Sequence, residues 1–298
     1  MKTLITGASG LVGSALVESL FKKGHTIRCL QRNKARDENM IWDTGALHTD
    51  RSDQAAFDVV IHLAGENVAG GRWDAARKER ILRSRVDGTR QLVDYISQPQ
   101  NKPKVFLCAS ATGYYGDCGS RDVDERSPQG SGFLAEVCRQ WEAEAARAEQ
   151  AGIRVVKLRF GMILSPKGGA LHKMLAPFKA GLGGVVGSGE QFISWTAMKD
   201  LTAIVHFLIE QNSASGPYNV ISPTPVTNRA FTKTLGEVLG KPTFLPVPAF
   251  LVRLIFGEMA GEMLLSSCKA MPTRLLEAGY RFQEEDLRHT LVSCILAQ

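Results

Sequence analysis

Three glycines near the amino terminus constrain the fold of this chain more than any other feature. Gly7, Gly10 and Gly13 follow a short β-rich run and precede a segment with apolar residues at helical spacing. A strand, a glycine turn and a helix in this order predict a phosphate-binding turn, because glycines allow the turn, close approach of a ligand and tight packing of helix on strand. The unpaired N–H groups and the positive dipole end at the helix start favour a dinucleotide diphosphate.

Strand and helix patterns alternate through the first half of the chain. The run at 58–65 is nearly all apolar, as expected for a buried parallel strand. Alternation of this kind is typical of an α/β fold with helices on both faces of the sheet. We therefore expect a Rossmann-type doubly wound parallel sheet. Beyond the glycine turn, strands are expected at 26–30, 40–42, 58–65, 104–110 and 153–160, with helices at 78–95 and 133–150.

The pattern changes after residue 163, where glycine-rich loops and prolines interrupt regular structure. Thr227 precedes an amphipathic segment and is a suitable N-cap for a helix. The apolar run 249–256 is expected to be a buried helix or one that packs within a lobe. We expect residues 1–163 to form an NADP-binding domain and residues 164–298 a smaller substrate-binding lobe with a C-terminal helical segment, between which the chain can interleave. A cleft between them is the expected substrate pocket.

Composition and charge argue against several classes of protein. No apolar run approaches the ~18 residues of a membrane span, and the amino terminus lacks a signal-peptide pattern, so we expect a cytoplasmic protein without a membrane partner. The six cysteines and six histidines are scattered without ligand spacing, which predicts neither a metal site nor a disulfide framework. The formal charge of +6 suits a phosphorylated cofactor, whereas no basic run interleaved with aromatics indicates nucleic acid.

The residues after the expected strand at 26–30 bear on the choice of nicotinamide cofactor. An acidic residue there binds the adenosine ribose, whereas a cation favours a 2′-phosphate. This chain has Arg32 and Lys34 there, and no carboxylate before Asp37. Arg32 can stack on adenine and pair with the phosphate through its planar guanidinium, which favours NADP over NAD. An exposed basic loop is the alternative.

Together these motifs resemble the extended and atypical short-chain dehydrogenase/reductases. The glycine spacing matches theirs, and His62-Leu63-Ala64-Gly65 is similar to the motif after their cofactor strand. Within that class the chain is most similar to the "epimerase family" proteins of bacteria and organelles, and the resemblance covers essentially the whole chain. It implies a candidate NADP-dependent oxidoreductase. The segments that carry it are Ala64-Gly65-Glu66-Asn67, Gly187-Ser188-Gly189-Glu190-Gln191, Pro225-Val226-Thr227-Asn228 and Pro246-Val247-Pro248.

The resemblance also implies which residues contact the cofactor. Arg85 stands where extended relatives have an asparagine, three residues before a Gly-Thr pair. Glu79 is expected to face the same side and pair with Arg85, with a surface ion pair as the alternative. Phe160 ends the strand at 153–160, where the backbone borders the nicotinamide. The implied cofactor-binding residues are Gly7, Ser9, Gly10, Leu11, Val12, Gly13, Arg32, Leu63, Ala64, Glu79, Arg85 and Phe160.

The catalytic acid is less clear from the same resemblance. Short-chain dehydrogenases commonly use a serine with a tyrosine and a lysine four residues apart, and the lysine and cofactor ribose lower the tyrosine pKa. Ser110 matches the serine. The helix at 133–150 places Leu134 and Cys138 at the other two positions, or Phe133 and Val137 in a register shifted by one. None of these side chains can exchange a proton in that role.

Other side chains are therefore candidates for the acid. Tyr114 and Tyr115 follow Ser110 closely, and Glu66 lies just beyond the cofactor strand. The leading hypothesis is an NADP-dependent oxidoreductase acting on a small carbonyl or alcohol. An NADP-assisted epimerase or isomerase and a non-catalytic, NADP-sensing regulatory protein are the alternatives. The only other partner expected is a second copy of the chain, in a homodimer.

Overall fold

A mostly parallel sheet forms the centre of the molecule. The computed structural model describes residues 1–31, 40–43, 46–48 and 56–296. The strands of the main sheet are β1 (Lys2–Thr6), β2 (Thr26–Gln31), β3 (Met40–Asp43), β4 (Ala46–His48), β5 (Val59–His62), β6 (Val105–Ala111), β8 (Arg154–Phe160) and β12 (Gly216–Val220). Their order is β12-β8-β6-β5-β1-β2-β3-β4. Every neighbouring pair is parallel except β3 and β4, which pair antiparallel at one edge.

The five strands expected after the glycine turn are confirmed as β2, β3, β5, β6 and β8. Their side chains alternate between two apolar layers, because successive residues of a strand face opposite sides of the sheet. Leu4 lies in one core cluster and its neighbour Ile5 in the other. Both layers are buried, so the strands are apolar throughout and pair in parallel with helices as crossovers.

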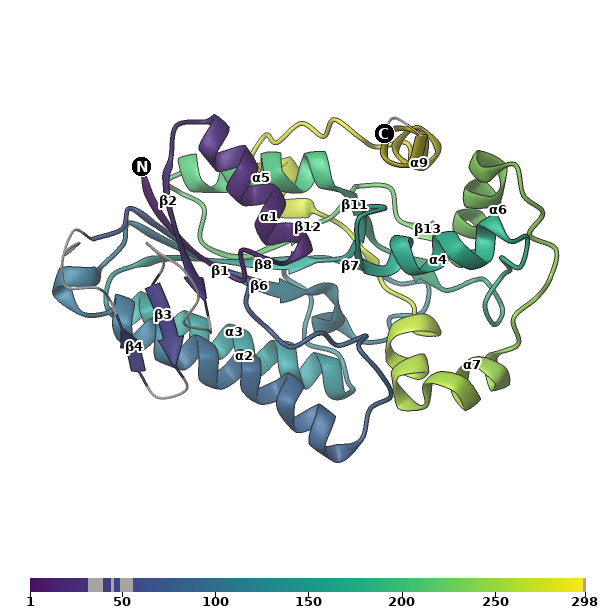
Figure 1. Ribbon diagram of the computed structural model, residues 1–298, viewed down its shortest axis with the longest axis horizontal. Helices are drawn as coiled ribbons and strands as arrows, with labels where there is room; N and C mark the ends of the chain where they lie inside the picture. Colours follow the sequence, from purple (N-terminus) through teal and green to yellow (C-terminus); the bar gives the residue numbers. More distant parts are fainter. Residues whose placement is uncertain (32–39, 44–45, 49–55, 297–298) are drawn as a thin grey trace.

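Helices cover both faces of the sheet (Figure 1). On one face α1 (Leu11–Lys22) and α5 (Met198–Glu210) contribute Leu16, Leu20 and Leu201 to the core. On the other face α2 (Ala75–Ile96) and α3 (Phe133–Gln150) contribute Leu92 and Trp141. The helices α2 and α3 confirm the expected helices at 78–95 and 133–150. This three-layer arrangement is the predicted Rossmann-type α/β fold.

The order of the strands determines where a ligand can bind. The chain winds outward from β1 through β2 in one direction, and from β5 through β6 and β8 in the other. Strand order therefore reverses between β1 and β5. In open α/β sheets, ligands bind in the crevice outside the carboxyl ends of the strands at this reversal. The glycine turn lies at the carboxyl end of β1, and the sequence 63–66 lies at that of β5.

The second half of the chain returns to the sheet before it leaves again. Residues 198–220 form α5 and β12, and β12 pairs with β8 in parallel register, with Tyr218 opposite Leu158. The chain therefore interleaves across residue 163. The division there into an NADP-binding domain and a substrate-binding lobe stays a prediction.

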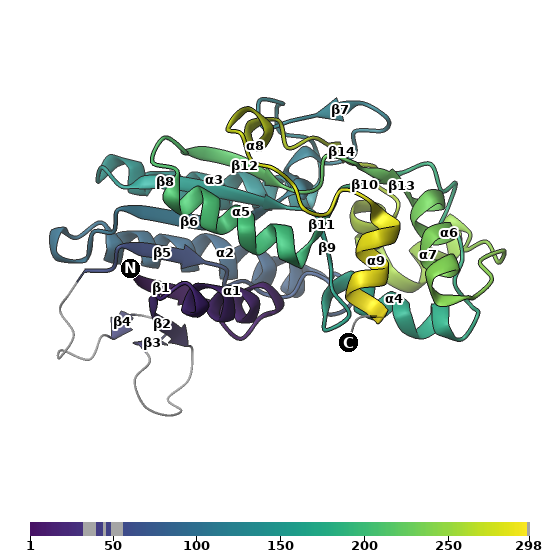
Figure 2. The same ribbon diagram turned by 90° about the horizontal axis from the view of Figure 1, so that it is seen from above.

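Helices α4 (Gly169–Lys179), α6 (Asn228–Leu239), α7 (Ala249–Phe256) and α9 (Leu287–Leu296) gather beyond one end of the sheet, whereas α8 (Thr273–Glu277) lies beside β12 (Figure 2). Phe231 and Leu235 of α6 pack there with helices α4 and α9, and Thr227 caps α6 through the Ala230 N–H at 3.2 Å, as predicted. The small two-stranded ladders are β14–β7, β11–β9 and β10–β13. The bounds of the remaining elements are η1 (Pro99–Asn101), η2 (Thr112–Tyr115), η3 (Ala260–Leu264), β7 (Asp122–Val123), β9 (Met162–Leu164), β10 (Phe192–Ile193), β11 (Trp195–Ala197), β13 (Val226–Thr227) and β14 (Lys269–Ala270).

The helix α7 corrects one of the two alternatives expected from the sequence, a buried helix, and leaves the other, a helix that packs within a lobe. It forms at the predicted residues 249–256, but its side chains are not buried: Phe250 is 66% exposed, Leu254 69% and Ile255 58%, whereas Val252 is buried. All of this run except Arg253 is apolar, so nearly every face of the short helix is apolar and the pattern alone does not show how much of it is covered. In the described part of the chain, no helix is both long and apolar enough to span a bilayer.

Candidate functional site at the carboxyl ends of the strands

The turn between β1 and α1 has the backbone that the glycine spacing predicts. Gly7 has a φ of +70°, which favours glycine. The Gly10 N–H donates to the Gly7 carbonyl at 3.0 Å. A Cβ atom on Gly13 would lie 2.2 Å from the Gly7 oxygen, so the helix can pack on the turn only without a side chain at this position. Gly7 and Gly13 thus have separate reasons to be glycine, the backbone conformation at Gly7 and the close approach of the turn at Gly13.

The amino terminus of α1 is free to bind an anion. Its N-cap, Gly10, has no side-chain cap, and no acidic residue occupies the first turn. Ser9 and Gly10 are exposed, while Leu11 and Val12 are partly buried. The first N–H groups of a helix have no partner within it, and the dipole makes this end positive. A diphosphate matches both properties, so the residues present fit a dinucleotide.

A buried polar chain holds the end of β5 against this turn. The Thr6 hydroxyl oxygen accepts hydrogen bonds from the Leu63 and Ala64 N–H groups at 3.2 Å each. It also bonds to His62 Nδ1 at 2.6 Å, and His62 Nε2 bonds to Thr89 at 3.1 Å. Burial, with the nearby Arg85 charge, lowers the pKa of His62 to about 3, so its ring is neutral. The Leu63 and Ala64 N–H groups are therefore bonded within the protein, and their backbone lies beside Gly7.

Arg85 lies beside the end of β5, but its predicted partner does not. Its Nη1 donates to the Glu66 carbonyl at 3.0 Å, and its guanidinium stacks over the Trp141 ring, 5.0 Å from the centroid. Burial lowers the pKa of Arg85. Glu79 instead forms an exposed ion pair with Arg83, four residues further on. The expected Glu79–Arg85 pair was wrong because six residues turn a helix by about 600°, which places the two on different faces.

The catalytic candidate Glu66 is also an ion-pair partner. Its carboxylate lies 3.4 Å from Arg77 Nη2, and its N–H donates to the Ser84 hydroxyl at 3.0 Å. The side chain is partly exposed at the end of β5, on the same side as Arg85. Glu66 is thus near the crevice, with a cation already beside it.

Ser110 is the first member of a buried network across three strands. It is the last residue but one of β6, is 3% exposed, and donates to Glu142 of α3 at 2.7 Å. The same carboxylate accepts two hydrogen bonds from Arg159 of β8, both at 2.8 Å. Because the Ser110 hydroxyl is the donor in its hydrogen bond to Glu142, its proton points at that carboxylate.

Tyr115 extends the same network to β12. Arg159 Nη1 donates to the Tyr115 hydroxyl at 2.9 Å, and that hydroxyl donates to Asn219 Oδ1 at 2.8 Å. Burial raises the pKa of Tyr115. Tyr114 differs, because it is only partly buried and its ring stacks on the Arg159 guanidinium, 3.6 Å from the centroid. Its hydroxyl makes no hydrogen bond to another described residue.

The start of α3 decides between the two registers left open by the sequence. A Cβ on Gly113 of η2 would lie 3.4 Å from Leu134 Cβ and 4.0 Å from Cys138 Sγ. Leu134 and Cys138 therefore face the segment after Ser110, in the register that lacks a tyrosine and a lysine. Burial raises the pKa of Cys138 to about 11. Neither residue can act as the usual acid.

Phe160 ends β8 opposite Ala111 and packs against both core clusters, at the edge where the nicotinamide is expected. Arg32 lies outside the described residues. In the described ranges, no group of three or more His, Cys, Asp or Glu side chains is placed to hold a metal ion.

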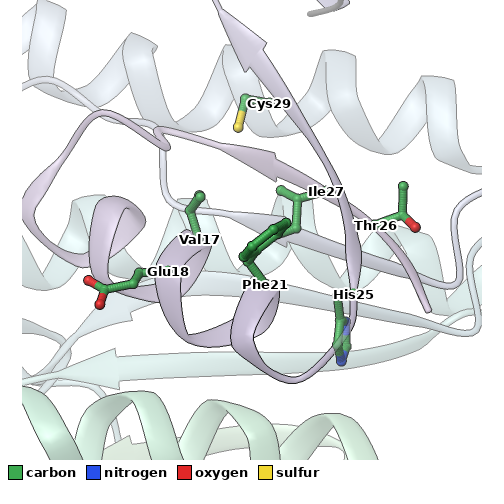
Figure 3. A pocket seen from close by; sticks show the side chains of 7 residues that line it. All are labelled: Val17, Glu18, Phe21, His25, Thr26, Ile27 and Cys29. Carbon is green, nitrogen blue, oxygen red and sulfur yellow. The ribbon is translucent and has the colours of Figure 1, made fainter.

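A separate hollow of about 550 Å³ lies between α1 and β2, lined by Phe21, His25 and Ile27 among others (Figure 3). It is not at the carboxyl ends of the strands.

Sequence reasoning missed Glu142, Arg159 and Asn219, which hold Ser110 and Tyr115 in place. One local signal was present for Glu142. It lies four residues after Cys138 and next to Trp141, on the apolar stripe of α3, where a carboxylate needs a buried partner. No comparable signal marks Asn219, because its partners come from distant parts of the chain.

Comparison with known proteins agrees with the fold and the turn. The model of the NAD dependent epimerase/dehydratase family matches residues 3–221, and a domain of unknown function (DUF1731) matches residues 247–294. The epimerase family protein MT2273 of Mycobacterium tuberculosis is 39% identical over 288 residues, which covers 96% of this chain and 95% of the relative. Human epimerase family protein SDR39U1 is 34% identical over 290 residues, covering 96% and 97%.

Solved structures give the same result. The crystal structure of human SDR39U1 (isoform 2) with NADPH has a TM-score of 0.91, 33% identity and full coverage of both chains. A nucleoside-diphosphate sugar epimerase from Corynebacterium glutamicum has a TM-score of 0.82 and 33% identity, covering 99% of this chain and 58% of that one. UDP-N-acetylglucosamine 4-epimerase from Bacillus cereus, 18% identical with a TM-score of 0.74, shares the fold. This chain belongs to the NAD dependent epimerase/dehydratase family.

Proposed function

We propose that this chain binds NADP(H) at the β1–α1 turn and acts as an oxidoreductase on a small carbonyl or alcohol. The observation that carries the proposal is the turn itself, where three glycines leave an uncapped helix end beside the β5 backbone. The relative human SDR39U1, which is similar over its whole length, was crystallised with NADPH. NADPH supplies a hydride when it is bound. The protein then has to orient the substrate and provide a proton.

Tyr114 is the proposed proton donor. Ser110 and Tyr115 already donate their protons to Glu142 and Asn219, and Glu66 lies beside Arg77. The Tyr114 hydroxyl is free of hydrogen bonds to other described residues, and its ring is held by Arg159 at the end of β8. The Ser110 oxygen keeps lone pairs that can accept a hydrogen bond from a substrate hydroxyl.

Cofactor binding is tested by one steric change with a matched control. Gly13→Ala places a Cβ 2.2 Å from the Gly7 oxygen and distorts the turn, whereas a Cβ on Gly261 meets no atom within 4 Å. We expect NADPH affinity, measured by fluorescence titration, to fall at least about tenfold in Gly13→Ala, or about 1.4 kcal/mol, and to be unchanged in Gly261→Ala. Unchanged affinity in Gly13→Ala, in a protein with native circular dichroism, contradicts the site.

Turnover is tested next, by following NADPH oxidation over a panel of small aldehydes and ketones. With a substrate that reacts, Tyr114→Phe is expected to lower kcat by about 10²-fold or more without changing NADPH affinity. Tyr218→Phe is the control, because Tyr218 also carries a guanidinium on its ring, that of Arg274 at 4.3 Å, but on β12. Equal kcat in wild type and Tyr114→Phe excludes Tyr114 as the acid.

One observation supports a second candidate, a non-catalytic NADP-binding protein. Leu134 and Cys138 fill the positions next to η2 where a proton-exchanging pair would stand. This candidate predicts tight NADPH binding with no oxidation by any carbonyl compound. An epimerase or isomerase would change its substrate without net NADPH oxidation. The homodimer and the cytoplasmic location stay predictions.

A further inference from the structure

Two cysteines from opposite halves of the chain meet at one side of the candidate site. Cys118 follows η2, and Cys268 directly precedes β14. Both pack in the small apolar cluster around Tyr115. Their thiol groups interact, and both donate to backbone carbonyls of η2, Cys118 Sγ to Tyr115 at 3.3 Å and Cys268 Sγ to Thr112 at 3.7 Å. The cysteines are free, and neither takes part in the proposed function.

The backbone holds these two cysteines together. The Cys118 N–H donates to the Ser267 carbonyl at 2.7 Å, and the Ser267 N–H donates to Asp117 Oδ1 at 3.0 Å. The Ser267 hydroxyl also donates to the Gly119 carbonyl. Backbone-bonded segments lie about 5 Å apart, and Ser267, to which Cys118 is bonded, directly precedes Cys268. Segments at this spacing can hold two cysteines near the Cα separation of about 4.4–6.8 Å found in disulfides. The cysteines can therefore be joined without moving either segment far.

We propose that Cys118 and Cys268 form a reversible redox site, which closes to an intramolecular disulfide when it meets a small-molecule disulfide and reopens with excess thiol. The proposal does not depend on the cofactor or the reaction. The disulfide links the segment that follows β6 and η2 to the C-terminal part of the chain.

The environment of Cys118 makes it the attacking sulfur. The neighbouring Cys268 thiol and the Arg121 charge together lower the pKa of Cys118 to about 7, although burial acts in the opposite direction. The neighbouring Cys118 sulfur and burial raise the pKa of Cys268. The thiolate is the nucleophile in disulfide exchange. Burial instead raises the pKa of each of the other cysteines, which are Cys29, Cys108, Cys138 and Cys294.

The exchange is balanced with glutathione disulfide as the oxidant. The Cys118 thiolate attacks one sulfur of glutathione disulfide, which forms a mixed disulfide and releases one glutathione thiolate. The Cys268 sulfur then attacks the Cys118 sulfur, which forms the protein disulfide and releases a second glutathione thiolate. The two cysteine protons go to the two released glutathiones. The protein loses two electrons, and glutathione disulfide gains them.

The bridge ties together two parts of the candidate site. Cys118 lies three residues after Tyr115 in the segment that follows Ser110. Cys268 lies six residues after Glu262, whose carboxylate binds the first N–H groups of α3. A covalent link between these segments limits their separation in the unfolded chain and in any local opening. Oxidation is therefore expected to stabilise the contact between these two segments beside the site.

The test treats reduced, full-length protein with glutathione disulfide. We expect a loss of two free thiols and, in a non-reducing digest, one linked peptide pair that contains Cys118 and Cys268. The thermal midpoint should rise by several degrees and return after dithiothreitol. Cys294→Ser, which changes a cysteine elsewhere on α9, should behave as wild type. Cys118→Ser should form no linked pair, and its midpoint should not rise.

Several results would overturn the proposal. One is a linked pair that appears only after unfolding in urea. Another is glutathione attached separately to both cysteines without a bridge between them. A third is a linked pair that joins other cysteines. The peptide measurement on the wild type needs no variant, so the test holds even if Cys118→Ser does not fold.

Discussion

A buried ion pair between Glu142 and Arg159 holds Ser110 and the residues that follow it in place. Glu142 is 9% exposed and accepts hydrogen bonds from Ser110 and from two nitrogens of Arg159. Removing one charge of a buried pair leaves the other without compensation, which is costlier than the pair itself is worth. Glu144, two residues on in the same helix, pairs with Arg90 and Arg147 at the surface. Glu142 and Glu144 therefore form ion pairs that differ in burial, so a comparison of the two shows what burial adds.

Glu142→Gln is expected to lower the free energy of unfolding by about 3–5 kcal/mol, because it leaves Arg159 charged and buried. Glu144→Gln is expected to change it by at most about 1 kcal/mol, since exposed pairs contribute little. Urea unfolding at pH 7 measures both. If the two variants lose equal stability, Glu142 does not hold the network.

The sequence showed much of the site at residue level, but not its supports. The glycine turn and the strand ends were predicted because each depends on residues close in sequence, whereas Ser110 was implied by the family resemblance. Glu142 and Glu144 look alike in the sequence, and only the packing of α3 on β6 and β8 makes one buried and the other exposed. Glu79 differs, because its pairing with Arg83, four residues on in the same helix, follows from helix periodicity and could have been read from the sequence.

At the level of elements, the start of α3 is bound to the C-terminal part of the chain. The Glu262 carboxylate of η3 accepts hydrogen bonds from the Phe133 and Leu134 N–H groups at 2.6 and 2.7 Å. These N–H groups have no partner within the helix, and the carboxylate also complements the positive dipole end. Gly132, the N-cap, supplies no side chain. A residue that is distant in sequence therefore caps the amino terminus of α3.

Glu262→Gln is expected to lower the free energy of unfolding by about 1 kcal/mol and to speed amide exchange at Phe133 and Leu134. The same change at Glu258, which pairs with Lys78 at the surface, should leave those amides unaffected. Hydrogen exchange read by mass spectrometry or NMR resolves the two. Unchanged protection of Phe133 and Leu134 in Glu262→Gln argues against the cap.

Local and distant contacts explain which elements could be predicted. The strands of the first half and the helices α2 and α3 have clear periodicity, and they form as expected. The strand β12 did not stand out, because Gly216-Pro217-Tyr218-Asn219-Val220 is short and begins with residues unfavourable to strands. It forms because β8 offers a free edge and Tyr218 fills the core. No local sequence pattern indicates the long-range contacts at Cys118 and Glu262.

At the scale of the whole molecule, buried neutral histidines make stability depend on pH. Burial lowers the pKa of His62 to about 3 and that of His206 to about 4, with nearby charges adding to the shift. An unfolded histidine takes up a proton near pH 6.5. Below that pH the unfolded state binds protons that the folded state does not, so the free energy of unfolding falls as pH falls. This contribution is complete above about pH 6.5 and is lost progressively toward pH 3.

Between pH 6 and pH 5, each of these histidines should contribute a slope of up to about 1.4 kcal/mol per pH unit. His62→Gln removes one titrating group and should flatten the slope by about that amount, although it also lowers stability at pH 7 by weakening the link between Thr6 and Thr89. The slope, and not the stability at one pH, is therefore the quantity to compare. If His62→Gln retains the wild-type slope in urea unfolding over this range, then His62 is protonated in the folded protein, and the neutral link between β1, β5 and α2 is wrong.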